Sequence, residues 1–538
     1  MQTPVPKIVY KDGTMIHLFT KIFPWIALLI FSFQGIAKQK NVLFIAIDDL
    51  KPLLNCYGHT EVLSPHIDSL AEDGTTFLNA HCQQAVCGPS RISLLTGYYP
   101  DTIGIYGMGS DKYKLRPKHP DILTLPQYFK NNGYTTVGTG KIFDPRNVEG
   151  DWHGPQDKIS WTRFFGKNPY NSKVGAPKID GHYHDPKLIS LTNKLKNEAK
   201  SKGLKGKQLR EYVRANGAGP AVESYAVPDD AYKDGATTER ALEQIETLAE
   251  NSNPFFLAVG FTKPHLPFVA PKKYWDLYDR DEIKLAPFQN YPEGAPSCAQ
   301  TDYIEARTYG GVPEKGKISS SIQKELIHGY LACVSYVDAQ VGKIIQKLKD
   351  EKLYKETIIV LWGDHGFHLG DKEIWGKHTN YEESTRSPLI VSNASADPGS
   401  KNTSPVNLID IFPTLNDLCS LESLEGLDGK SLKPILDGRS DSVQKFAASI
   451  YPHSGYWGIA IRTDNHRYIS WHKGKSTNEY HGLRFKSEPA FVELYDYSKD
   501  PLEQKNLVDS IEYKGIKQEL VAISKDHIEF TQSKQFKK

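Results

Sequence analysis

The sequence predicts an α/β fold: a large mixed sheet flanked by helices, with a smaller sheet near the C-terminus. Amphipathic stretches with apolar residues at helical spacing, the longest from Ile322 to Leu348, alternate with continuous apolar runs. Such runs predict strands that are buried on both faces. The four runs are Asn41–Ile47, Tyr134–Gly138, Phe255–Gly260 and Thr357–Trp362.

Polar residues follow the predicted strands at their carboxyl ends, where open α/β sheets bind ligands. In strand order they are Asp48 with Asp49, Lys141, His265, and Asp364 with His365. The adjacent carboxylates of Asp48 and Asp49 repel each other and favour a cation between them, and oxygen ligands suit Ca²⁺ or Mg²⁺. Taken alone, such a pair is more often a solvated acidic turn or a helix cap.

The N-terminal 37 residues resemble a secretory signal peptide. Lys21 precedes the apolar run 22–33, and the small residues Gly35 and Ala37 fit a cleavage site. The run is shorter than the roughly 20 residues that span a bilayer. We therefore expect cleavage after Ala37, export to the periplasm or the medium, and no stable membrane insertion. Translation from Met15 would fit the same pattern.

Charge and cysteine content narrow the possible partners and chemistry. The 66 basic and 64 acidic residues of the 538-residue chain leave a net charge of +2, which predicts no attraction to nucleic acid or anionic membranes. The six cysteines show no metal-binding CxxC pair. An oxidising compartment would permit disulfides among them, in a connectivity that stays open. They are Cys56, Cys82, Cys87, Cys298, Cys333 and Cys419.

Composition predicts a main domain over residues 38–440 and a C-terminal subdomain over 441–538. Residues 145–235, rich in Lys, Gly, Pro, Tyr and His, predict an insertion of loops over the site rather than a domain with its own core. Short strand-like runs and a last helix predict the C-terminal sheet. These runs are Ala447–Tyr451, Gly458–Arg462, Tyr468–Trp471 and Glu493–Tyr497.

The stretch VCGPSR, residues 86–91, places a cysteine directly before a Gly-Pro turn. Ser90 is predicted to cap a helix over residues 91–96 that Gly97 ends. Cys87 would then lie near a helix N-terminus, where positive partial charge favours an anion. A lone free cysteine is most often a buried structural thiol, so the surrounding motif carries the functional interpretation.

The core Cys87-Gly88-Pro89-Ser90-Arg91, followed by 94–97, resembles the signature of type I sulfatases, whose cysteine is oxidised to formylglycine. Further motifs occur in family order and are most similar to those of iduronate-2-sulfatases. They are residues 41–50, 83–97, 100–102, 125–130, 254–268 and 364–366, with the sulfatase-like ending 493–503. The resemblance covers most of the chain beyond the signal. It implies an alkaline-phosphatase-like sulfatase fold and hydrolysis of sulfate esters.

The resemblance also implies a role for each motif residue. Asp48, Asp49, Asp364 and His365 would bind Ca²⁺ beside residue 87. Arg91 would support the formylglycine, Lys141 would bridge it to the sulfate, and Lys377 would bind a sulfate oxygen. His265 would contact the sulfate and protonate the departing sugar oxygen. Outside these motifs, the same residues would be interpreted as a surface ion pair, solvated lysines and a packed histidine.

In this family hydrated formylglycine attacks sulfur with one hydroxyl, and loss of the proton from the other expels sulfate. Maturation would need a formylglycine-generating enzyme as a partner. The sequence departs from the pattern at Asp144, where the family usually has a histidine. His119 or His153 is a candidate substitute.

The substrate predicted by the resemblance is a sulfated oligosaccharide or polysaccharide. A 2-O-sulfated uronic acid in glycosaminoglycan or in an ulvan-type algal glycan fits the similarity to iduronate-2-sulfatases. Two alternatives stay open: a phosphomonoester or phosphonate hydrolase of the same superfamily, and a non-catalytic binder of sulfated glycans in which Cys87 stays unmodified.

Overall fold

The computed structural model describes residues 39–149, 156–165, 183–301, 303–474 and 488–534. The predicted signal peptide and His153 lie outside these residues. Lys40–Lys538 form one compact unit, separate from Met1–Gln39. Within the described part of the chain, no helix has the length and apolar character needed to cross a membrane.

An eight-stranded mixed sheet in the order β13-β2-β12-β9-β1-β7-β4-β5 confirms the predicted α/β fold. The strands from β9 to β5 run parallel, whereas β12 is antiparallel to both of its neighbours. The four predicted runs form the parallel centre: β1 (Asn41–Asp48), β4 (Thr135–Gly140), β7 (Phe255–Pro264) and β9 (Thr357–Gly363). The outer strands are β2 (Gly74–Phe77), β5 (Arg163–Phe165), β12 (Leu389–Ser392) and β13 (Ser400–Asn402).

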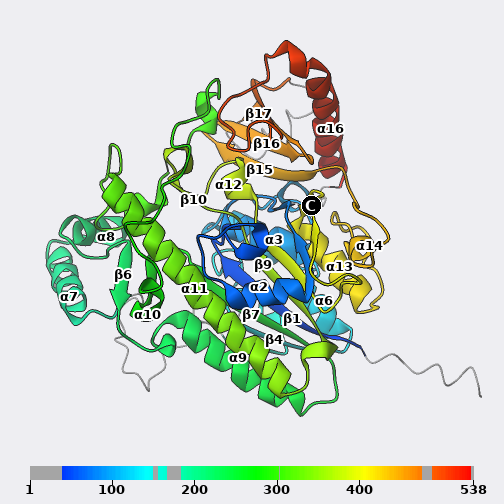
Figure 1. Ribbon diagram of the computed structural model, residues 1–538, viewed down its shortest axis with the longest axis horizontal. Coiled ribbons are helices and arrows are strands. Elements are labelled where there is room, and N and C mark those ends of the chain that lie inside the picture. Colours follow the sequence, from blue (N-terminus) through cyan, green and yellow to red (C-terminus); the bar gives the residue numbers. More distant parts are fainter. Residues whose placement is uncertain (1–38, 150–155, 166–182, 302, 475–487, 535–538) are drawn as a thin grey trace, which may run out of the picture. The chain divides into compact units, whose positions relative to one another are not determined.

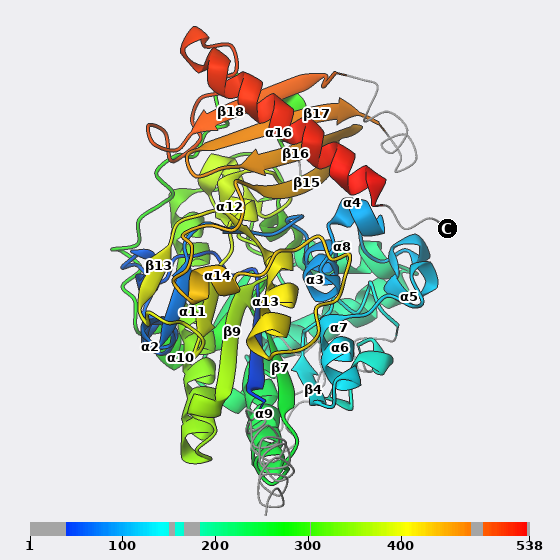
Figure 2. The ribbon, with the colours of Figure 1, turned by 90° about the vertical axis from the view of Figure 1, so that its right-hand side faces the viewer.

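Helices cover both faces of this sheet (Figures 1 and 2). Successive side chains of β1 point to opposite faces of the sheet and pack against a different set of helices on each face. Leu43, Ile45 and Ile47 pack with α2 (Pro65–Glu72), α9 (Lys233–Ala249) and α11 (Ser320–Asp350). Val42, Phe44 and Ala46 pack with α3 (Cys87–Thr96), α6 (Leu125–Asn131) and α13 (Ile411–Leu418). Because both faces are covered, β1 is buried along its whole length, which explains its unbroken apolar run.

The smaller C-terminal sheet is also confirmed. It is antiparallel, in the order β15-β16-β17-β18, and α16 (Lys514–Ser533) lies across it (Figure 2). Leu520 and Ile528 of α16 pack against its side chains. The strands are β15 (Ala447–His453), β16 (Tyr456–Arg462), β17 (His466–Lys473) and β18 (Phe491–Asp496).

The insertion at 145–235 is more regular than the sequence predicted, although residues 150–155 and 166–182 lie outside the described part. Helices α7 (Pro186–Ser201) and α8 (Gly206–Ala215) pack around a small apolar cluster of Leu195, Val213 and Ala218. The strand β6 (Val222–Tyr225) pairs with β8 (Phe268–Pro271). The sequence did not predict these helices, because the few apolar residues that form this cluster are dispersed among lysines.

Candidate active site

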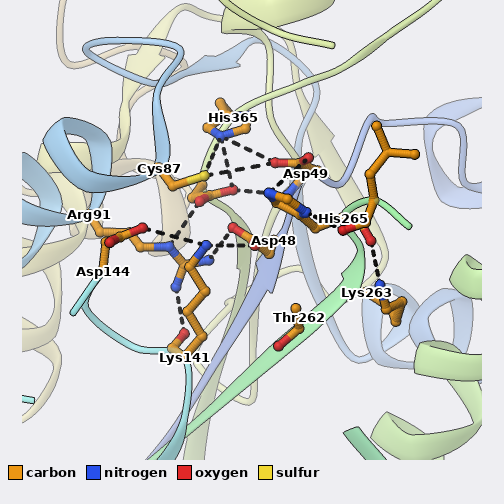
Figure 3. Close-up of polar contacts among 12 residues, drawn as sticks. Asp48, Asp49, Cys87, Arg91, Lys141, Asp144, Thr262, Lys263, His265 and His365 are labelled. Atoms are coloured by element: carbon orange, nitrogen blue, oxygen red, sulfur yellow. Dashed lines mark hydrogen bonds and ion pairs between the residues drawn. The ribbon is translucent and has the colours of Figure 1, made fainter. Parts of the chain in front are cut away.

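The polar residues predicted from the strand ends converge at the carboxyl edge of the large sheet (Figure 3). Asp48 is the last residue of β1, and Asp364 follows β9. Lys141 directly follows β4, and His265 directly follows β7. Cys87 and Arg91 come from α3, and Lys377 directly follows the short strand β11 (Trp375–Gly376). Ion pairs, hydrogen bonds or potential ligand contacts connect all nine predicted site residues: Asp48, Asp49, Cys87, Arg91, Lys141, His265, Asp364, His365 and Lys377.

Cys87 is the first residue of α3 and is only 1% exposed. Its Sγ lies 3.3 Å from His365 Nε2 and 3.9 Å from Asp49 Oδ1. Burial and the charge of Asp48 raise the pKa of the thiol well above its usual value. An unmodified Cys87 is therefore protonated at neutral pH, and a thiol is a far weaker nucleophile than a thiolate.

The prediction that Ser90 caps this helix is wrong. The helix begins earlier, with Val86 in the capping position, because its first turn tolerates Pro89. The Ser90 hydroxyl donates instead to the carbonyl oxygen of Asp364 and so ties α3 to the end of β9. Gly97 ends the helix with a φ of 75°, as predicted.

Arg91 joins the two central strand ends from a fully buried position. Its Nη2 lies 3.1 Å from Asp48 Oδ1 and its Nε lies 2.8 Å from Asp364 Oδ2, while Nη1 donates to the carbonyl oxygens of Lys141 and Ile142. Burial alone would raise the pKa of Asp48, but the charges of Lys141 and Arg91 outweigh it and hold that pKa well below its usual value. Asp48 is therefore ionised.

Two buried lysines flank the same carboxylates. Lys141 Nζ lies 2.7 Å from Asp48 Oδ2, and Lys377 Nζ lies 2.8 Å from Asp49 Oδ2. Lys377 also contacts Glu305, whose Oε2 lies 2.8 Å from its Nζ. Three cations, those of Arg91, Lys141 and Lys377, thus face this cluster of acidic groups.

His265 shares Glu305 with Lys377: its Nδ1–H donates to the Leu266 carbonyl, and its Nε2 lies 3.4 Å from Glu305 Oε1. Burial and the charge of Lys377 lower the pKa of His265 to about 4, although Glu305 opposes the shift. The imidazole is therefore neutral at pH 7, and a bound anion would raise its pKa.

Carboxylate, thiol and imidazole donors of the site lie close enough together to hold a divalent cation. Donor atoms of Asp48, Asp49, Cys87 and His265 lie within 4.8 Å of one another, and so do those of Cys87, Asp364 and His365. Burial raises the pKa of Asp49 to about 7 despite Lys377 and His365, and Asp48 and Glu305 add to the shift. The protein's own cations therefore leave negative charge at Asp49 uncompensated, which a bound cation would balance.

Glu305 was not predicted from the sequence. It lies in a short 3₁₀ turn, Glu305–Thr308, in an irregular segment that carries no recognisable motif. Lys377 and His265 outweigh the effect of burial and lower the pKa of Glu305 to about 2. This carboxylate fixes both a lysine and a histidine of the site.

The departure at Asp144 has a structural explanation. Asp144 is buried, its Oδ2 lies 3.7 Å from Lys141 Nζ, and Arg146 pairs with it. His119, a candidate substitute for the missing histidine, donates its Nε2–H to the carbonyl oxygen of Ile103 at 2.7 Å. Ile103 is not one of the nine site residues, so this contact gives no support for the substitution.

The sequence matches a known family over most of its length. Residues 40–421 match the Sulfatase family, and residues 370–529 match the C-terminal region of N-sulphoglucosamine sulphohydrolase. The chain belongs to the sulfatase family. This sulfatase is 32% identical to human iduronate 2-sulfatase over 536 residues, which cover 87% of this chain and 90% of that one. It is therefore a sulfuric ester hydrolase.

Solved structures of other proteins have the same fold as this sulfatase. A protein solved in complex with its substrate D-glucosamine-2-N,6-O-disulfate matches with a TM-score of 0.66 at 20% identity, over 92% of this chain and 99% of that one. A phosphonate monoester hydrolase from Silicibacter pomeroyi also matches with a TM-score of 0.66 at 21% identity, over 91% and 95%. Likeness at this identity shows the alkaline-phosphatase-like fold alone, because one fold supports several activities.

Proposed function

We propose that this sulfatase removes sulfate from a sulfated oligosaccharide or polysaccharide, with formylglycine made from Cys87 as the nucleophile and Ca²⁺ as the cofactor. The observation that supports this most strongly is the position of Cys87, at the first turn of a helix and among carboxylates and buried cations. Asp48, Asp49, Asp364, His365 and residue 87 would hold the cation. When present, formylglycine supplies a hydrated aldehyde as nucleophile, and the cation polarises the sulfate ester.

The chain's own residues would divide the remaining work. Lys141 and Lys377 stabilise negative charge on the sulfate oxygens from fixed positions, which needs no reorganisation during the reaction. His265 presents Nε2 toward the site and protonates the departing sugar oxygen once the anionic substrate has raised its pKa. Arg91 fixes the position of α3 relative to the ends of β1 and β9 through its bonds to Asp48 and Asp364.

For the substrate, we propose a 2-O-sulfated uronic acid in a glycosaminoglycan or an ulvan-type glycan. The similarity to iduronate 2-sulfatase supports this class. We also propose export to the periplasm or the medium after cleavage of residues 1–37, and maturation by a formylglycine-generating enzyme.

Phosphonate hydrolysis is the alternative to test, because one fold supports several activities. The identity to iduronate 2-sulfatase favours sulfate. The deciding experiment pairs mass spectrometry of the Cys87 peptide with release of sulfate or phosphonate from defined esters, including 2-O-sulfated disaccharides. We expect formylglycine at residue 87 and sulfate release. Active protein with an unmodified Cys87 would contradict the nucleophile, and faster cleavage of phosphonate esters would contradict the substrate class.

Thiol counting gives an independent measure of maturation, because all six cysteines of this chain lie in its described part and are buried and free of disulfides. Native protein should therefore react slowly with a thiol reagent. After unfolding without reductant, unmodified protein should show six thiols, and fully converted protein five. The Cys87→Ala variant should show five in either case. A native disulfide would appear as a count of four or fewer.

Cation binding should depend on pH through Asp49. Its pKa is raised to about 7 in the metal-free protein, so a cation must displace a proton from it below that pH. We expect the apparent Ca²⁺ affinity of chelator-treated protein to rise by about tenfold per pH unit up to pH 7 and to level off above it. Calorimetric titrations from pH 5 to 8 measure this slope. Asp49→Asn should bind more weakly and lose the slope; an unchanged slope would show that another group carries the proton.

A further inference from the structure

Asp144 holds one cation inside the site and a second at its rim. Its Oδ2 lies 3.7 Å from Lys141 Nζ and 2.7 Å from Arg146 Nη2, and its Oδ1 lies 2.8 Å from Arg146 Nε. The Lys141 side chain is 4% exposed, whereas that of Arg146 is 39% exposed. In Figure 3, Asp144 lies on the far side of Asp48 from His265. Arg146 is thus a second cation beside Asp144, and unlike Lys141 it is partly exposed to solvent.

The turn that carries Arg146 is fixed to the helix of Cys87. The Asn147 N–H donates to the Asp144 carbonyl, and the Asn147 side chain donates to the carbonyl oxygens of Gly107 and Tyr113. Asn147 also packs so closely against Gly88 that a Cβ there would lie 1.9 Å from Asn147 Oδ1. Because only glycine permits this approach, Arg146 keeps a constant position relative to residue 87.

The charge of Arg146 reaches His378, the residue after Lys377. Burial, the charge of Lys377 and, more weakly, that of Arg146 lower the pKa of His378 to about 3. Asp144 contacts the Nε and Nη2 edge of the guanidinium and so fixes its plane. Because Asp144 holds the Nε and Nη2 edge, a substrate carboxylate would meet the Nη1 and Nη2 edge, where a guanidinium can also form two hydrogen bonds.

We propose that Arg146 is a specificity-determining residue that binds the carboxylate of a uronic acid in the substrate, while the sulfate to be removed lies deeper, between Lys141 and Lys377. Asp144 is the positioning residue that orients Arg146. The assignment deepens the proposed function and rests on it for the identity of the sugar. The partial exposure of Arg146 separates it from the buried cations, so it meets a part of the saccharide beyond the reacting ester.

The test compares a 2-O-sulfated uronate disaccharide with its carboxyl-reduced form. Wild-type protein should prefer the carboxylate form roughly 10- to 100-fold in kcat/KM, the range expected for hydrogen bonds to a charged group. Arg146→Gln should remove most of this preference, mainly through KM. Arg146→Lys should keep part of it, and Asp144→Asn should lower it. Arg439→Gln is the matched control, because Arg439 pairs with Asp437 at the same spacing on an exposed surface and should keep the full preference.

An equal loss on both disaccharides in Arg146→Gln would place Arg146 on the reacting sulfate and overturn the assignment. An unchanged preference in that variant would overturn it as well. If Arg146→Gln instead changed only the reaction of substrates that carry a second sulfate, Arg146 would bind that sulfate and not the carboxylate, and the assignment would be wrong. Calorimetric binding of the two desulfated disaccharides gives the same ratio without turnover. Failure of wild-type protein to release sulfate would therefore contradict the proposed function, while the binding ratio still decides the role of Arg146.

Discussion

Replacing Arg91 with alanine is expected to lower the free energy of unfolding by about 3–5 kcal/mol and to abolish sulfate release. The guanidinium is fully buried and compensates the carboxylates of Asp48 and Asp364. Without it, both charges stay in the core with fewer partners, and the carbonyls of Lys141 and Ile142 lose their donor. Urea unfolding followed by tryptophan fluorescence measures the first effect. Sulfate release under conditions in which the variant is folded measures the second.

The exposed arginine Arg439, which is 63% exposed, provides the control for this variant. Arg439→Ala should unfold like wild type, because exposed ion pairs add little to stability. Arg91→Lys keeps the charge but cannot reach both carboxylates with one ammonium group, so its stability should fall between those of wild type and Arg91→Ala. An Arg91→Ala protein as stable as wild type would contradict the role given to Arg91.

Replacing Arg467 with alanine should lower the free energy of unfolding by a similar amount, about 3–5 kcal/mol, and should also slow sulfate release. Arg467 is buried in β17, where it pairs with Glu382 and Glu503 and donates to the Asn380 carbonyl. Residues 372–382 include Lys377, and both ends of this segment bond to the C-terminal region. Lys372 pairs with Glu503 at one end, and at the other the Tyr381 hydroxyl donates to Glu493.

The expected loss of activity in Arg467→Ala therefore acts through the position of Lys377. An increase in KM that is larger than the decrease in kcat is the signature, because Lys377 is proposed to bind sulfate. Lys499→Ala removes an exposed cation of the same region, which pairs with Glu512, and should leave both quantities unchanged. Full activity in a destabilised Arg467→Ala protein would show that the C-terminal sheet stabilises the fold without positioning Lys377.

The centre of the fold was predictable because its strands are buried on both faces. The unbroken run of β1 follows directly from that burial. The outer strands β2 and β13 have four and three residues, too few for any period to show, and pair through tertiary contacts. The helices α7 and α8 of the insertion were not predicted for a related reason. Few apolar residues form the cluster between them, so the sequence shows no clear helical pattern.

The site was predictable where a residue follows a strand or lies in a motif. Asp48 and Asp364 satisfy both conditions, and the structure brings them to one guanidinium. Glu305 satisfies neither, because it reaches Lys377 and His265 from an irregular segment far away in sequence. Arg146 is near a motif, but its pairing with Asp144 depends on the geometry of a turn that no spacing rule specifies.

The C-terminal sheet also determines when during synthesis Cys87 can be reached. Val86 packs with Trp471 and Tyr495, and the N–H of Ile450 donates to the Gln83 carbonyl, so the end of the chain lies against the segment that leads into α3. This part is synthesised after Cys87. The enzyme that we propose to convert Cys87 would therefore have to act before the strands β15 to β18 fold over the target.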